Sequence, residues 1–175
     1  SFLHLKIDDD GSMYLVYHQR FDSNPSSEAH EVRIHQQFLN EDNWPVTAVY
    51  EYRKETITTY PDKDVIGTYE FVNHGTAAAD GNMLTTQLVR LNQDGSVSGD
   101  VTGTWKKAAS SAGYDYITLK LGNVTYKGVF FKQYDEENTP KQKMTFTAIG
   151  GNNTTVWGSM VDTSSDKTIA NMAAE

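Results

Sequence analysis

Short apolar segments separated by turn residues run through the second half of the chain. Within each segment, apolar and polar side chains alternate and Val, Thr, Tyr and Phe are frequent, which is typical of half-buried β-strands. The sequences between the segments, such as NQDGS, LGN and GGNN, contain the Gly, Asn and Asp residues that favour tight turns. Strands are predicted at residues 67–73, 84–91, 96–106, 114–121, 124–134, 141–149 and 155–161. This spacing predicts an antiparallel meander.

Residues 47–57 supply a further candidate strand and bring the number to about eight, enough to close a small barrel that has no free edge. Gly103 and Gly128 lie inside predicted strands, where glycine marks a bend or a bulge. The sequence therefore predicts an all-β fold, whose main part is a small antiparallel β-barrel over residues 47–162. Residues 163–175 are predicted to form a weakly ordered tail, or at most one helical turn.

A second β-structure is predicted before the barrel. Residues 13–21 are rich in Tyr, Val, Leu and Phe, and residues 31–38 alternate apolar with polar side chains, so both are predicted strands. The polar sequence FDSNPSSEA joins them into a hairpin, and a turn at residues 40–43 leads to a third strand near Val46. Because a lone hairpin is marginally stable in water, we expect either the barrel or a partner chain to cover it.

Composition narrows the possible partners. The net charge of −8 and the pI near 5.0 disfavour binding to nucleic acid or to an anionic membrane, since both would be repelled, whereas a neutral polymer would not be. The absence of cysteine excludes a disulfide framework, a thiolate metal site and a cysteine nucleophile. No apolar run approaches the length of about 20 residues that a membrane span needs. Because the chain begins at Ser1, we expect it to be a processed, truncated or engineered product.

Two sequence blocks resemble a known enzyme family. The segment YLVYHQRF, followed by HEVRIHQQFLNEDNWPV, is similar to the last blade of the five-bladed β-propeller of family 43 glycoside hydrolases, in particular the bacterial endo-arabinanases. The matching residues are His18, Arg20 and Phe21, then His30 to Gln36, then Leu39 to Val46. Asn43 stands where the family commonly has Gly, and both tolerate positive φ.

The second half, from GTYEFVNHGT to VWGSMV, resembles the C-terminal barrel that follows the propeller in these enzymes and has a lipocalin-like architecture. The resemblance divides the chain into an incomplete blade hairpin at residues 1–46, the barrel at 47–162 and the tail at 163–175. It implies a bacterial protein, secreted to the outside or to the periplasm, that takes part in arabinan degradation. Its partners would be the missing N-terminal portion of the propeller, from the same gene or as a separate chain, and arabinan or an arabino-oligosaccharide.

The same resemblance places the three catalytic acids on earlier blades, so we expect no catalytic residue in this chain and no glycosidase activity from it alone. The family also holds calcium on the propeller axis through a Gly-His-Asn sequence expected immediately before Ser1. Calcium is therefore expected in the complete propeller, and no cofactor in this chain. The acidic clusters at residues 8–10, 41–42 and 135–137 are interpreted as solvated turns.

Four residues are candidates for sugar binding. His18 and Arg20 share one face of a strand and would either point toward the propeller centre or pack within the blade. Trp105 and Trp157 offer aromatic faces on which a sugar could stack, with core packing as the favoured alternative. Trp44 is expected to anchor the hairpin against the barrel.

A metal site within the chain is not predicted, because His30 and His35 lie five residues apart and point to opposite faces of a strand. The alternative function is a free-standing carbohydrate-binding or lipocalin-like ligand-binding module.

Overall fold

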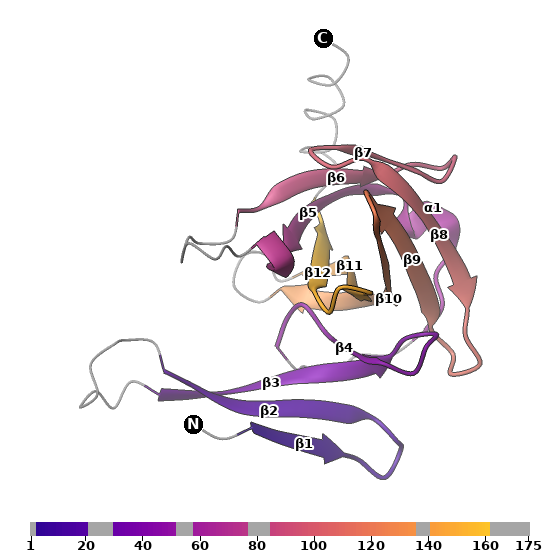
Figure 1. The fold of residues 1–175 in the computed structure, drawn as a ribbon. Helices are drawn as coiled ribbons and strands as arrows, with labels where there is room; N and C mark the ends of the chain where they lie inside the picture. The colour runs from indigo at the N-terminus through magenta and orange to yellow at the C-terminus, as the bar shows by residue number, and fades with distance from the viewer. Residues whose placement is uncertain (1–2, 21–29, 52–57, 77–84, 136–140, 162–175) are drawn as a thin grey trace.

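The computed structural model describes residues 3–20, 30–51, 58–76, 85–135 and 141–161 (Figure 1). A four-stranded antiparallel sheet, ordered β1-β2-β3-β4, precedes a closed antiparallel barrel ordered β10-β11-β12-β5-β6-β7-β8-β9. This confirms the predicted all-β class and the small barrel. The predicted tail, residues 163–175, lies outside the described residues.

The strands of the sheet are β1 (Leu3–Ile7), β2 (Met13–Arg20), β3 (His30–Leu39) and β4 (Pro45–Thr47). The strands of the barrel are β5 (Gly67–Asn73), β6 (Gln87–Leu91), β7 (Ser96–Gly99), β8 (Gly103–Ala109), β9 (Asp115–Leu121), β10 (Val124–Asp135), β11 (Lys141–Gly150) and β12 (Thr155–Met160). A short helix, α1 (Asp62–Val65), precedes β5, and a 3-10 turn, η1 (His74–Thr76), follows it.

The N-terminal sheet is larger than the predicted hairpin. Strand β1 pairs with β2 in a register that sets Leu5 opposite Leu15. The acidic turn that joins them is closed by a hydrogen bond from the Asp8 backbone N–H to the Ser12 carbonyl, 2.9 Å. Gly11 takes a φ of +85° there, which glycine adopts without strain. The two predicted strands are thus the middle of a four-stranded sheet.

The barrel has eight strands, but the prediction chose one of them wrongly. Of the segment 47–57, the described residues after Thr47 leave the sheet and run along the outside of the barrel. The eighth strand arises because the predicted strand 96–106 is two strands, β7 and β8. Gly99 makes the break possible: its φ is +106°, and a Cβ there would lie 2.5 Å from the Leu88 carbonyl oxygen.

The inside of the barrel is a packed aromatic and aliphatic core. Tyr69 and Phe146 are fully buried, and their ring centroids lie 5.0 Å apart. Phe146 faces Gly158 across the β11–β12 pair, where a Cβ would come within 2.2 Å of the ring, so the glycine makes room for the aromatic side chain. Side chains thus occupy the space in which a lipocalin-like barrel would hold an internal ligand.

The segment before β5 is fixed to the barrel by a buried carboxylate. The backbone N–H of Tyr60 donates to Asp115 Oδ2 at 2.7 Å, and Lys107 Nζ lies 3.7 Å from the same oxygen. The Tyr60 hydroxyl accepts a hydrogen bond from the backbone N–H of Lys132 at 3.0 Å. Asp115 is 2% exposed, and these partners compensate for the burial of its carboxylate.

The close approach of β10 and β11 yields a stability prediction. A Cβ on Gly128 would lie 1.7 Å from the Thr147 carbonyl oxygen, whereas one on Gly151 would meet nothing within 4 Å. We expect Gly128→Ala to lower the free energy of unfolding by about 1 to 3 kcal/mol or more. The melting temperature should therefore fall by about 2 to 12 °C or more. Gly151→Ala is the control, with a change below about 2 °C. Equal melting temperatures in calorimetry would contradict the close approach.

Candidate binding site at the junction of sheet and barrel

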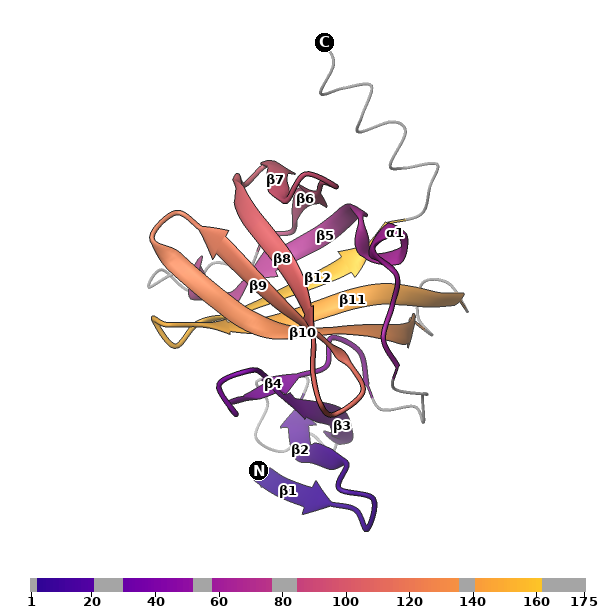
Figure 2. The same cartoon turned by 90° about the vertical axis from the view of Figure 1, so that its right-hand side faces the viewer.

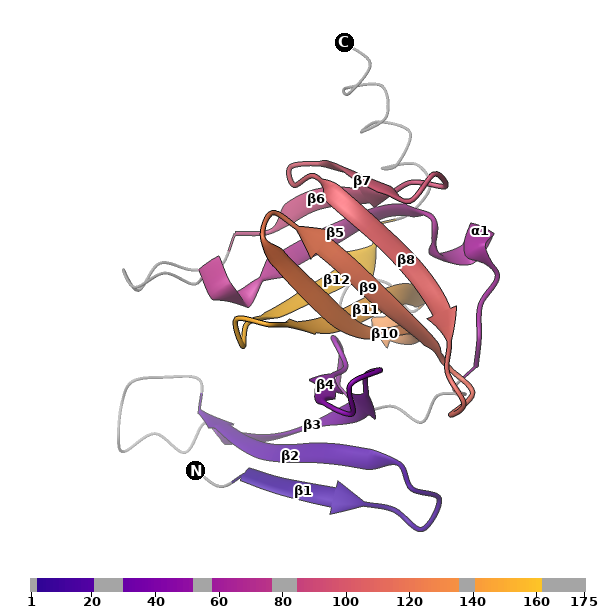
Figure 3. The ribbon, with the colours of Figure 1, turned by 45° about the vertical axis from the view of Figure 1, so that its right-hand side comes forward.

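The sheet and the barrel meet through a small apolar cluster, which we call the junction. Val129 and Phe131, on the outer side of β10, pack against Phe38, Val46 and Ala48 from the sheet side, all of them buried. The rings of Phe38 and Phe131 are 4.7 Å apart. Figures 2 and 3 show β3 and β4 next to the barrel wall formed by β10, with β1 farthest away. The sheet is therefore held by one edge.

Hydrogen bonds fix the direction of the chain across the junction. The backbone N–H of Tyr50 donates to Gln133 Oε1, and Gln133 Nε2 donates back to the Tyr50 carbonyl, both at 2.9 Å. The Tyr50 hydroxyl also lies 2.7 Å from Ser159 Oγ. A further hydrogen bond is made from the barrel side, where the Tyr114 hydroxyl donates to the Leu39 carbonyl at 2.7 Å. The bonds of Tyr50 join the segment after β4 to β10 and β12, and that of Tyr114 joins the end of β3 to the residue before β9.

A stack of aromatic rings crosses the junction on its other side. His35 lies between Tyr17 of the sheet, at 5.8 Å, and Trp157 of the barrel, at 6.3 Å, with interplanar angles of 20° and 15°. His74 meets Trp157 edge-on at 4.6 Å. The ring nitrogens are also engaged, since His35 Nδ1 is 2.8 Å from the Ala48 carbonyl oxygen and His74 Nδ1 is 3.1 Å from that of Thr155.

Of the four predicted sugar-binding residues, Trp105 and Trp157 lie apart, on the inner and outer sides of the barrel wall. Trp105 is 9% exposed, its indole N–H donates to the Asn92 carbonyl at 2.8 Å, and its edge meets Phe130, so the geometry favours core packing. Trp157 lies outside the barrel in the aromatic stack. His18 and Arg20 lie in β2, and their side chains are outside the described part of the structure. Sugar binding by these four residues stays a prediction.

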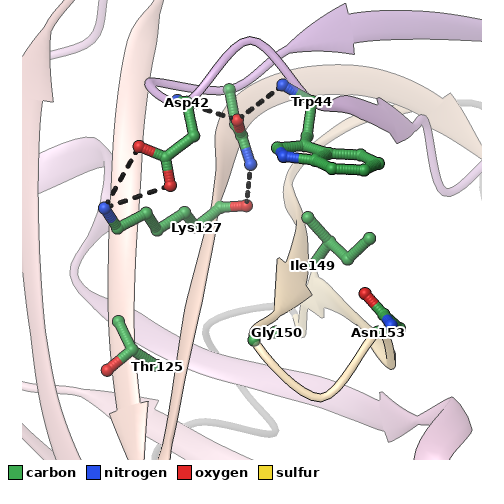
Figure 4. Close-up of a pocket in the computed structure, with 9 residues that line it drawn as sticks. Asp42, Trp44, Thr125, Lys127, Ile149, Gly150 and Asn153 are labelled. Carbon is green, nitrogen blue, oxygen red and sulfur yellow. Dashed lines mark hydrogen bonds and ion pairs between the residues drawn. The ribbon is translucent and has the colours of Figure 1, made fainter.

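A pocket of about 390 Å³ opens where the β3–β4 loop meets the barrel. It is lined by Asn40, Asp42, Trp44, Thr125, Lys127, Ile149, Gly150, Gly151 and Asn153. In Figure 4 the indole of Trp44 lies on the same side as Ile149 and Asn153, and the ion pair of Lys127 with Asp42 lies opposite. Residues from the sheet and from three barrel segments therefore share one concave surface.

The prediction that Trp44 anchors the hairpin against the barrel was wrong, because Trp44 is 60% exposed. The buried Asn40 explains this orientation. Its Oδ1 accepts hydrogen bonds from the backbone N–H groups of Asp42 and Trp44, both at 3.0 Å, while its Nδ2 donates to the Lys127 carbonyl at 3.0 Å. Phe38 takes the anchoring position instead. The sequence signal was the Asn-x-Asp motif before Trp44, which is typical of an Asx turn.

The charges of the pocket neutralise one another in large part. Lys127 Nζ lies 3.1 Å from a Glu41 carboxylate oxygen and 3.2 Å from one of Asp42. Hydrogen bonds to Glu41 and then to Asp42 raise the pKa of Lys127 above its usual value. Both carboxylates thus face a single cation, which differs from the opposed acid pair that flanks a scissile bond in glycosidases.

The described residues contain no group of three or more His, Asp or Glu side chains placed to hold a metal ion. Among them there is also no helix with the length and apolar character needed to cross a membrane.

The sequence profile of a family of C-terminal lipocalin-like domains, GH43_C, matches residues 49–158. The chain belongs to this family. The matched residues include every strand of the barrel except the end of β12.

Several similar proteins are longer than this chain and match it over only part of their own length. The extracellular endo-α-(1→5)-L-arabinanase 2 of Bacillus subtilis is 38% identical over 149 residues, which are 85% of this chain and 30% of that relative. Two solved structures are also similar, and in each case the match covers 91% of this chain and 35% of the other chain. The YxiA protein of Bacillus licheniformis, a family 43 glycoside hydrolase, has a TM-score of 0.80 and 37% sequence identity. The endo-1,5-α-L-arabinanase of Thermotoga petrophila has a TM-score of 0.79 and 35% sequence identity. The chain thus spans about a third of the length of these proteins.

The junction predicts how the sheet opens. Phe38→Ala removes the side chain that packs on Phe131, which should lower the free energy of opening the sheet by about 3 to 5 kcal/mol. We expect amide hydrogens of residues 30–48 to exchange at least about a hundredfold faster, because they exchange through local opening, while β9 to β12 stay protected.

The matched control is Leu39→Ala, whose side chain is 36% exposed in the same strand. Hydrogen exchange followed by mass spectrometry measures both variants. Unchanged exchange in Phe38→Ala would show that the cluster does not hold the sheet.

Proposed function

We propose that this chain is the C-terminal, non-catalytic part of a secreted bacterial enzyme that degrades arabinan, in which the barrel supports the last blade of a β-propeller. The family membership and the names of the Bacillus subtilis and Thermotoga petrophila relatives support this assignment. In this proposal residues 1–46 are the blade, 47–162 the barrel and 163–175 a tail. The partner is the N-terminal portion of the propeller, and the substrate is arabinan.

The observation on which the proposal rests is that the sheet has apolar side chains exposed on both faces. Leu3, Leu5 and Ile7 are 71%, 57% and 62% exposed on one face. Val32, 57% exposed, lies on the other, as the strand pairing requires. Three neighbouring apolar side chains on one face form a patch of the kind that monomeric proteins rarely leave exposed, and Val32 adds an exposed apolar side chain on the other. A propeller blade has this character, because a neighbouring blade covers each face.

The barrel fits the role of a support. Its outer wall at β10 holds the sheet along the β3–β4 edge and leaves both faces open for neighbouring blades. No acid pair suited to glycoside hydrolysis occurs among the residues described at the junction. Calcium in the complete propeller belongs to the same proposal, and its ligands would come from outside the described residues, which form no metal-binding group.

The alternative, a free-standing lipocalin-like binding module, receives less support. An internal ligand would need space that Tyr69, Phe71, Phe130 and Phe146 occupy. The exposed faces of the sheet would also have no purpose in such a module.

A chimera tests the proposal. This chain replaces the matching C-terminal third of the Bacillus subtilis arabinanase, and hydrolysis of linear arabinan is measured as released reducing sugar. We expect the chimera to be active, the relative without its C-terminal third to lose most of its activity, and this chain alone to show none. Support through the junction also predicts that Phe38→Ala in the chimera shortens the half-life of activity on heating, whereas Leu39→Ala does not.

Two results would overturn the proposal. One is turnover by the purified chain alone that persists after contaminating enzymes are removed. The other is a chimera that is folded but no more active than the truncated relative.

A further inference from the structure

The pocket beside the junction exposes a large aromatic side chain in rigid surroundings. Trp44 leaves 60% of its surface in water, although burial of an indole is among the strongest apolar contributions to stability. Its ring is not part of the junction cluster or of the barrel core. An exposed tryptophan that lines a concave pocket is a feature of binding sites rather than of folding.

The backbone of Trp44 is held in place before any ligand binds. Besides the two hydrogen bonds to Asn40 Oδ1, the Asn40 N–H donates to the Trp44 carbonyl at 2.9 Å. Pro45 follows and restricts Trp44 to an extended backbone, and Asn43 closes the turn with a φ of +60°. A binding surface that is already ordered loses little conformational entropy when a ligand arrives.

The rest of the pocket supplies neutral polar groups and open space. Thr125 and Asn153 provide a hydroxyl and an amide, and Ile149 adds an apolar surface. Gly151 has nothing within 4 Å of the position of a Cβ, so its backbone is accessible. The volume of about 390 Å³ lies within the range of about 300 to 1,000 Å³ usual for small-ligand sites.

The charges select against anionic ligands. Among the residues that the structure describes, Lys127 is the only cation that lines the pocket, and it is already shared by Glu41 and Asp42, so the two carboxylates outnumber it. A uronic acid or a phosphate would be repelled. A neutral sugar presents hydroxyl groups for Thr125 and Asn153 and an apolar C–H face for the indole of Trp44.

We propose that this pocket binds a short stretch of a neutral furanosyl chain, with one arabinofuranosyl ring stacked on Trp44. The choice of arabinan rests on the proposed function of the chain, while the preference for a neutral sugar follows from the pocket itself. The site lies on the outer wall of the barrel, between β10, β11 and the β3–β4 loop, and gives the barrel a role in holding polysaccharide besides its support of the sheet.

The three tryptophans allow a direct test by NMR titration of the whole chain with linear α-1,5-arabinopentaose. We expect the indole N–H signal of Trp44 to shift with saturation. The indole N–H of Trp105 should not move, because it is buried and bonded to the Asn92 carbonyl. An oligogalacturonide of equal length should bind more weakly, as the charge argument requires.

Substitutions then assign the site. Trp44→Ala should weaken arabinopentaose binding by about tenfold or more, while Trp44→Phe, which keeps an aromatic face, should retain part of it. Leu5→Ala, which removes another exposed apolar side chain far along the sheet, is the matched control and should bind as the wild type does. The unchanged Trp105 signal verifies folding in each variant.

The proposal is overturned if arabinopentaose leaves the Trp44 signal unmoved, if Trp44→Ala binds as tightly as the wild type, or if the oligogalacturonide binds more tightly. Its failure is separable from failure of the proposed function. An unresponsive pocket in a chain that still forms an active chimera would reject only the binding site. A saturable Trp44 shift in a chain whose chimera is inactive would reject only the supporting role.

Discussion

The packing of Phe38 against the outer wall of β10 is the contact on which the arrangement of the molecule depends. Most barrel strands direct apolar side chains inward and polar ones outward, but β10 is apolar on both sides, with Phe130 inside and Val129 and Phe131 outside. A strand of that kind has to be covered. The sheet covers it by one edge only, so the position of the sheet and the shape of the nearby pocket both follow from this contact.

The sequence predicted the barrel well because period-two alternation and turn residues are local signals. It failed where a strand broke without a change in composition, at Gly99, since the corner depends on the Leu88 carbonyl of a neighbouring strand. It also missed β1. That strand is only five residues long and is exposed throughout.

The tryptophans show why the site was harder to predict than the fold. Composition alone treats Trp44, Trp105 and Trp157 alike, but the environments of Trp105 and Trp157 depend on residues distant in sequence. Trp157 contacts the rings of His35 and His74, and the indole N–H of Trp105 donates to the Asn92 carbonyl. Trp44 faces outward because of an asparagine four residues before it. Only this last cause is local, and it was available from the sequence.

The paired hydrogen bonds between Tyr50 and Gln133, and the contact of the Tyr50 hydroxyl with Ser159, have a consequence for inheritance. Residues on the sheet side of the junction and residues of the barrel are matched to each other in shape and in hydrogen bonding. A recombination event that joined this barrel to an unrelated sheet would separate hydrogen-bond donors from their acceptors and leave the side chain of Phe131 exposed to water. The edge of the sheet and the barrel wall are therefore expected to be inherited together as one block.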